Sequence, residues 1–144
     1  MSHKLTFNVL PFDPRHAQKA EIPLPITPQD LADTLQTNWP DGDVQIYSKR
    51  DETVVRFYIT FKEDLWLMAR YTESFGGCFF VSGLPKTLAT EIILWYREYI
   101  ADKLALFVVV VESGSIYDLT SSTTTKDIDR MYPFPIDEGW EWEW

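Results

Sequence analysis

An amphipathic helix followed directly by an apolar strand constrains this chain more than any other feature. Apolar side chains recur at helical spacing from Lys86 to Lys103, and the run LALFVVVV follows at 104–111. The spacing predicts a helix with one broad apolar face. That face comprises Leu88, Ile92, Trp95 and Tyr99, widened by Ile93, Tyr96 and Ile100. An apolar run ending in β-branched residues is typical of a strand at the centre of a sheet or covered on both faces, so a helix on a sheet is the expected core.

Short alternating or apolar runs predict the other strands. Four of them follow one another, separated by polar or glycine-rich turns: 44–47, 55–61, 65–71 and 78–81. Short turns favour antiparallel pairing of these four. In 65–71 both faces carry apolar side chains, so the pattern does not say which face is buried. Leu5 to Val9 also alternates, and because Pro11 follows, it is expected at an edge or in a late-docking position.

Capping residues predict two further helices. Thr27 precedes Pro28 and Asp30, which is the pattern of an N-cap, a first-turn proline and an acid at the helix start; that helix should end near Trp39. A shorter helix is expected from Lys126 to Met131. The chain, residues 1–144, is therefore predicted to form a single α+β domain. Its sheet should be mostly antiparallel and twisted, with about five to seven strands, covered by one long and one shorter helix.

Composition and net charge limit the classes of partner that this chain is expected to bind. The 144 residues are 45% apolar and 15% aromatic, which is enough for a core without disulfides or metals. A single cysteine and the lack of a long apolar segment predict a cytoplasmic protein without a membrane span. The net charge of −9 disfavours nucleic acid, because binding to phosphates needs clustered lysine and arginine. It favours a basic protein partner, although solubility alone also explains it.

Catalytic motifs are not evident. The two histidines, His3 and His16, lie near the terminus and in a proline-rich loop, and Cys78 lies in an apolar strand where a thiol is usually inert. No phosphate-binding loop occurs. Paired carboxylates at 41/43, 51/52, 63/64 and 127/129 fit turns and caps better than metal or acid–base sites. The expectation is therefore a non-enzymatic protein that binds no cofactor and no metal.

One alternative stays open. Trp66, Met68 and Trp95 either fill the core or line a pocket for an apolar ligand. A pocket that also held an acidic residue would instead suit a small-ligand binder or a carboxylate-dependent enzyme.

The C-terminal segment, residues 132–144, is rich in tryptophan and glutamate. Its proline residues prevent a helix, and its alternation places indoles and carboxylates on opposite sides of an extended strand. The segment is expected to pack on its own domain or on a second subunit, which would give a homodimer, or on another protein. The partner-binding candidates are Glu138, Trp140, Glu141, Trp142, Glu143 and Trp144.

The region from Glu91 to Ile128 carries a resemblance. Its WYREYI helix, LALFVVVVE strand, YDLT return and TTTKDI cap resemble segments of small acidic bacterial proteins of the immunity type, which neutralise toxin domains. The resemblance covers about a quarter of the chain and contains no diagnostic residue set. It implies a non-catalytic bacterial binding protein and assigns no site residues.

Overall fold

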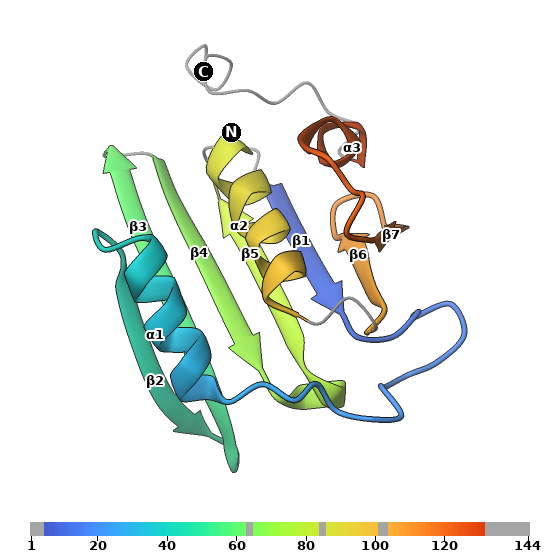
Figure 1. The fold of residues 1–144 in the computed structure, drawn as a ribbon, viewed down its shortest axis with the longest axis horizontal. Coiled ribbons are helices and arrows are strands. Elements are labelled where there is room, and N and C mark those ends of the chain that lie inside the picture. Colours follow the sequence, from blue (N-terminus) through green and yellow to red (C-terminus); the bar gives the residue numbers. More distant parts are fainter. Residues whose placement is uncertain (1–4, 63–64, 84–85, 101–103, 132–144) are drawn as a thin grey trace.

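The computed structural model describes residues 5–62, 65–83, 86–100 and 104–131 of the chain (Figure 1). The strands in these residues are β1 (Leu5–Leu10), β2 (Asp43–Lys49), β3 (Glu52–Lys62), β4 (Leu65–Thr72), β5 (Cys78–Gly83), β6 (Leu106–Val110) and β7 (Ser115–Leu119). The helices are α1 (Pro28–Asn38), α2 (Lys86–Tyr99) and α3 (Thr125–Met131), and η1 (Ser74–Gly76) is a single 3-10 turn.

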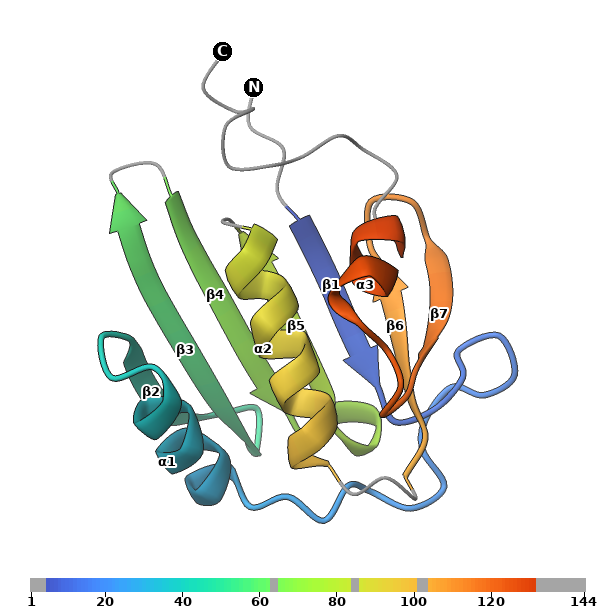
Figure 2. The ribbon, with the colours of Figure 1, turned by 45° about the horizontal axis from the view of Figure 1, so that its top comes forward.

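The strands form one antiparallel sheet in the order β2-β3-β4-β5-β1-β6-β7. The predicted α+β class is confirmed, and so is the row of four consecutive antiparallel strands, β2 to β5. All three helices lie on the same face of the sheet (Figures 1 and 2). α1 packs on β2 and β3, α2 packs on β1 and β5, and α3 contacts α2. Among the described residues, no helix covers the other face, called here the open face.

The edge position predicted for the first strand was wrong. β1 does not lie at an edge but pairs with both β5 and β6, near the centre of the sheet. Phe7 and Val9 are buried on the helix side of the sheet. Pro11 comes just after the strand ends at Leu10, so its missing N–H costs no ladder hydrogen bond. The proline therefore ended the strand without restricting its place in the sheet.

The core is centred on α2, as predicted, but the helix ends at Tyr99. Ile92, Ile93 and Tyr96 are fully buried. The Tyr96 ring stacks on Phe79 of β5 with 4.0 Å between the centroids. Trp95, expected at the middle of the buried face, is only partly buried, and so is Tyr99. The buried face is thus rotated away from Trp95 and Tyr99 toward Ile93 and Tyr96.

The burial of Arg97 also differs from what the sequence predicts. Arg97 lies outside the apolar face that the helical spacing predicts, and such a position favours exposure of a charged residue, but the residue is only 3% exposed. Its Nη1 donates to the carbonyl oxygen of Leu119 at 3.1 Å, and its Nη2 donates to that of Ile100 at 3.3 Å. One guanidinium group thus joins the end of α2 to the end of β7. A buried charge is tolerated there because backbone acceptors bind it and the helix C-terminus favours a cation.

The shorter helices begin as predicted. The Thr27 hydroxyl oxygen accepts from the Asp30 backbone N–H at 3.2 Å, which caps α1. α1 buries Leu31 and Leu35 against the sheet. The strand β6 was predicted to lie at the centre of the sheet or to be covered on both faces. It lies one position from the sheet edge, and its Phe107 and Val109 are only half-buried.

Candidate functional site

The helical side of the molecule presents an acidic surface. The exposed charged side chains of α1 and α2 are all carboxylates, and we call this set the acidic helical face: Asp30, Asp33, Glu91 and Glu98. The two cations of α2 do not offset them there. Lys86 forms an ion pair with Asp129 of α3 at 3.3 Å, and Arg97 is buried. Carboxylates therefore dominate the surface of α1 and α2, whereas α3, on the same side of the sheet, adds the exposed cations Lys126 and Arg130.

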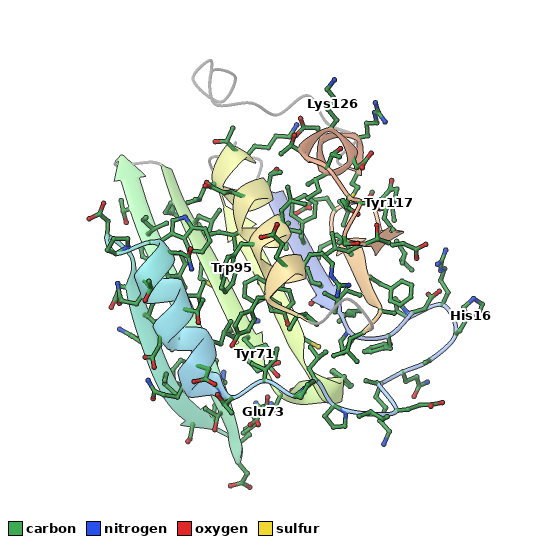
Figure 3. The ribbon with its side chains drawn as sticks, in the orientation of Figure 1. His16, Tyr71, Glu73, Trp95, Tyr117 and Lys126 are labelled. Atoms are coloured by element: carbon green, nitrogen blue, oxygen red, sulfur yellow. The ribbon has the colours of Figure 1, made fainter. Side chains whose placement is uncertain are left out.

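A shallow hollow of about 450 Å³ lies within the acidic helical face. Glu91, Trp95 and Glu98 line it, because positions i, i+4 and i+7 of a helix share one side. Figure 3 shows Trp95 between α1 and α2, where its ring meets Trp39 edge-on at 5.5 Å and stacks on Tyr99 at 5.3 Å. Two carboxylates beside an indole ring suit a lysine or arginine side chain, which pairs with the carboxylates and gains a cation–π contact.

The open face carries a second, larger hollow of about 800 Å³. It lies between the loop at residues 12–18, the turn that joins β2 to β3, and η1. Two backbone hydrogen bonds tie the chain that follows this loop to η1: Ala20 N–H to Phe75 O at 3.0 Å and Leu24 N–H to Gly76 O at 2.9 Å. We call this hollow the open-face groove.

Arg70 lies in the open-face groove. The strand register places Asn8, Phe80 and Arg70 side by side on β1, β5 and β4. The guanidinium carbon of Arg70 is 5.2 Å from the centre of the Phe80 ring. Arg70 Nε and Asn8 Oδ1 are both buried, and neither has a hydrogen-bond partner among the described residues. The groove therefore combines a cation, an aromatic ring and an amide.

This group was not predicted from the sequence. Arg70 shares one face of β4 with Trp66 and Met68 and pairs with Arg56 of β3. An arginine on an otherwise apolar strand face was the available signal. Its proximity to Asn8 could not be found from the sequence, because β1 was expected at an edge.

Trp66, Met68 and Trp95 do not come together. Trp66 and Met68 lie on the open face, where Trp66 stacks on Tyr58 at 6.0 Å. Trp95 lies on the opposite side of the sheet, packed against the core. Neither the shared pocket nor the shared core that the sequence allowed is formed.

Cys78 and His16, which the sequence disfavours as catalytic residues, lie in different environments. Burial, with the nearby charge of Glu52, raises the pKa of the Cys78 thiol to about 11. The thiol therefore stays protonated at neutral pH, and it donates to the carbonyl oxygen of Ser74 at 3.3 Å. His16 lies in the exposed part of the loop (Figure 3). Within the described ranges, no three metal-binding side chains gather in one place.

The partner-binding candidates from Glu138 to Trp144 lie outside the described residues, as does His3. Packing of the C-terminal segment on the domain or on a second subunit stays a prediction.

Comparison of the chain with protein-family models, curated proteins and solved structures finds no match. The resemblance to immunity-type proteins therefore also stays a prediction. None of the helices in the described ranges has the length and apolar character needed to cross a bilayer.

Proposed function

We propose that this chain is a non-enzymatic protein-binding module that meets a basic protein partner through its acidic helical face. The observation that carries the proposal is the single sign of the exposed charges on α1 and α2. Neighbouring carboxylates repel one another, and a positively charged partner relieves that repulsion. Complementary charge across an interface mainly increases the association rate and the specificity of binding.

The hollow at Trp95 supplies an anchor for such a partner. Charged surfaces alone bind weakly in salt, whereas a side chain seated in a pocket of aromatic and charged groups is the usual centre of binding energy. A lysine or arginine of the partner placed between Glu91 and Glu98 would meet both carboxylates and the Trp95 ring.

An immunity-type inhibitor of a basic bacterial toxin is the specific form of this proposal that the resemblance suggests. The single cysteine suits a reducing compartment, and the cytoplasm is the location we propose. The C-terminal segment is the second proposed contact, to the partner or to another copy of the chain.

The test begins with capture of partners by the immobilised full-length chain and identification of a basic protein among them. Association of that purified protein is then measured with two matched variants. In the first, Asp30 and Asp33 become Asn while Glu91 and Glu98 become Gln. In the second, the same change in net charge is made at exposed sites away from the acidic helical face: Glu21→Gln, Asp43→Asn, Asp51→Asn and Asp118→Asn.

The first variant is expected to lower the association rate at least tenfold at low ionic strength, while the control lowers it by a factor of about two. Trp95→Ala should instead speed dissociation. Equal rates for both charge variants would refute a role for the acidic helical face, because only net charge would then matter.

A further inference from the structure

The open-face groove is chemically unlike the rest of this acidic protein. Its lining includes the cations Lys49, Arg50 and Arg70 and a single carboxylate, Glu52. The Glu52 carboxylate already accepts from the Ser74 hydroxyl at 2.7 and 2.9 Å. In the described part of the chain, no carboxylate is within ion-pair distance of the three cations. The groove is therefore locally positive in a chain whose net charge is −9.

Aromatic side chains surround these charges. Four rings that line the groove come from separate parts of the fold: Phe12, Tyr47, Phe75 and Phe80. Its volume, about 800 Å³, is within the usual range for sites that hold a small molecule. The shape and the rings suit a flat apolar group, and the cations suit an anionic one.

Two buried polar atoms are left without partners in this lining. Arg70 Nε and Asn8 Oδ1 have no hydrogen bond within the described residues. Buried polar groups in proteins are normally satisfied, so the Nε–H of Arg70, a donor without a partner, points to a ligand that carries an acceptor oxygen. Asn8 Oδ1 is itself an acceptor and does not bind an anion. The guanidinium plane of Arg70 is held over Phe80 at 5.2 Å, which orients it before any ligand arrives.

Left-handed backbone conformation is found beside the groove. Arg50 and Asp51, with φ of 53° and 66°, form the two-residue hairpin turn between β2 and β3, where this conformation is usual. Phe75 of η1, with φ of 58°, also lines the groove, and there the conformation is uncommon for a residue other than glycine.

From these observations we propose that the open-face groove binds a small organic anion. The guanidinium group of Arg70 binds its carboxylate, sulfonate or phosphate oxygens, Lys49 and Arg50 add charge at the rim, and the surrounding rings hold its aromatic portion. This site faces away from the acidic helical face and does not depend on the proposed protein partner.

The test uses the full-length chain and two fluorescent probes that differ by one charge. 8-Anilinonaphthalene-1-sulfonate carries a sulfonate, and N-phenyl-1-naphthylamine is the same ring system without it. Arg70→Met is expected to weaken binding of the sulfonate probe about tenfold or more and to leave binding of the neutral probe within about twofold. Arg70→Lys, which keeps the charge, should restore part of the loss.

Arg56→Met is the matched control. Arg56 lies directly beside Arg70 on the open face, but it donates to Gln45 at 2.7 Å and does not line the groove. Its removal should change the affinity for the sulfonate probe by less than about twofold. Equal losses in the two variants, or no loss in Arg70→Met, would overturn the proposal.

Two further measurements cover the remaining outcomes. Lys49 is exposed, so Lys49→Met tests the groove even where Arg70→Met does not fold, and it should weaken binding of the sulfonate probe about threefold. An unchanged affinity there, in the absence of a folded Arg70→Met, refutes the site. Competition then separates charge from shape: 1-naphthoate should displace the probe at lower concentration than inorganic phosphate does. Equal displacement by both would show recognition of charge alone and would refute an organic ligand.

Discussion

The buried guanidinium group of Arg97 is stabilised by backbone groups. Its Nη1 and Nη2 donate hydrogen bonds to the carbonyl oxygens of Leu119 and Ile100. These two carbonyl groups would lose their donor if the guanidinium group were absent. The residue thus acts as a cross-link between elements distant in sequence.

Arg97→Met should therefore destabilise the protein by about 2–4 kcal/mol, because buried acceptors left without a donor each cost about 1–3 kcal/mol. Urea unfolding followed by circular dichroism measures the effect. Glu98→Gln, at the exposed neighbour, is the control and should change the unfolding free energy by less than about 0.5 kcal/mol. A similarly small effect of Arg97→Met would mean that the guanidinium group is solvated.

The buried thiol of Cys78 should make the unfolding free energy of the protein fall at alkaline pH. Its pKa rises from the ordinary value of 9.0 to about 11, mainly through burial. The folded state therefore holds the thiol proton more tightly than the unfolded chain does. Its stabilising contribution is complete below pH 9 and is lost as the pH rises through 11. Cys78→Ala should make the fall in unfolding free energy between these pH values shallower.

Urea melts at pH 7, 9 and 10.5 provide the comparison. Tyr71, whose pKa burial raises to about 12, adds a decline of its own, and it is present in both proteins. The difference between the two proteins reports the thiol together with the effect of its charge on the pKa of Tyr71 and Tyr96. Parallel curves for the variant and the parent chain would show that the thiol is not buried.

Among the elements, α2 contributes most to the core. Ile92 is completely buried between the helix and the sheet. Ile92→Ala should destabilise the protein by about 2–5 kcal/mol, through lost transfer free energy and the cavity left behind. Glu91→Ala, one residue away on the exposed side, should have little effect. A loss below about half a kcal/mol for Ile92→Ala in a urea melt would disprove the packing of this helix face.

The C-terminal segment, residues 132–144, is predicted to pack as an extended strand on the domain or on a second subunit. Truncation after Asp137 should lower the melting temperature, or dissociate an oligomer on size exclusion, because three tryptophan side chains would lose their buried area. Glu138→Gln, Glu141→Gln and Glu143→Gln together keep the rings and should affect melting less. Unchanged melting and elution of the truncated chain, with tryptophan emission in the intact protein at the solvated maximum, would show that the segment is free.

Among the described residues, the surface of α1 and α2 and the open-face groove carry charges of opposite sign. The helical side carries the carboxylates of α1 and α2, and the open side carries the cations of the groove. This segregation is not evident from the net charge, which averages both sides. It allows one small domain to present separate surfaces to a basic protein and to an anion.

Salt should therefore affect the proposed interaction with a basic partner mainly through the association rate. Association with a basic partner should slow by at least tenfold between about 20 mM and 500 mM salt, while dissociation changes little, because ions screen long-range attraction. Stopped-flow fluorescence of Trp95 and its neighbours can follow both rates. Association that is independent of salt would exclude electrostatic steering.

Much of the fold was predictable because its signals are local. Thr27 and Pro28 marked the start of α1, and the alternation of β3 separated its buried face from its wet face. The helix and most of its buried face were predicted, but Trp95 and Tyr99 are only partly buried, because only the sheet decides which of the aromatic rings are covered. For the candidate site, the acidic character was evident from composition, whereas the groove was not.

By itself, the sequence determined the α+β class, the antiparallel meander and a stable core, because hydrophobic period and turn chemistry act between near neighbours in the chain. Only the tertiary structure decided that β1 lies centrally, which brings Asn8 beside Phe80 and Arg70. It also decided that Arg97 is buried and that the carboxylates of α1 and α2 lie on the opposite side of the sheet from the groove cations. Strand order and face are set by packing between distant segments, and no local pattern encodes which strand becomes the neighbour of which.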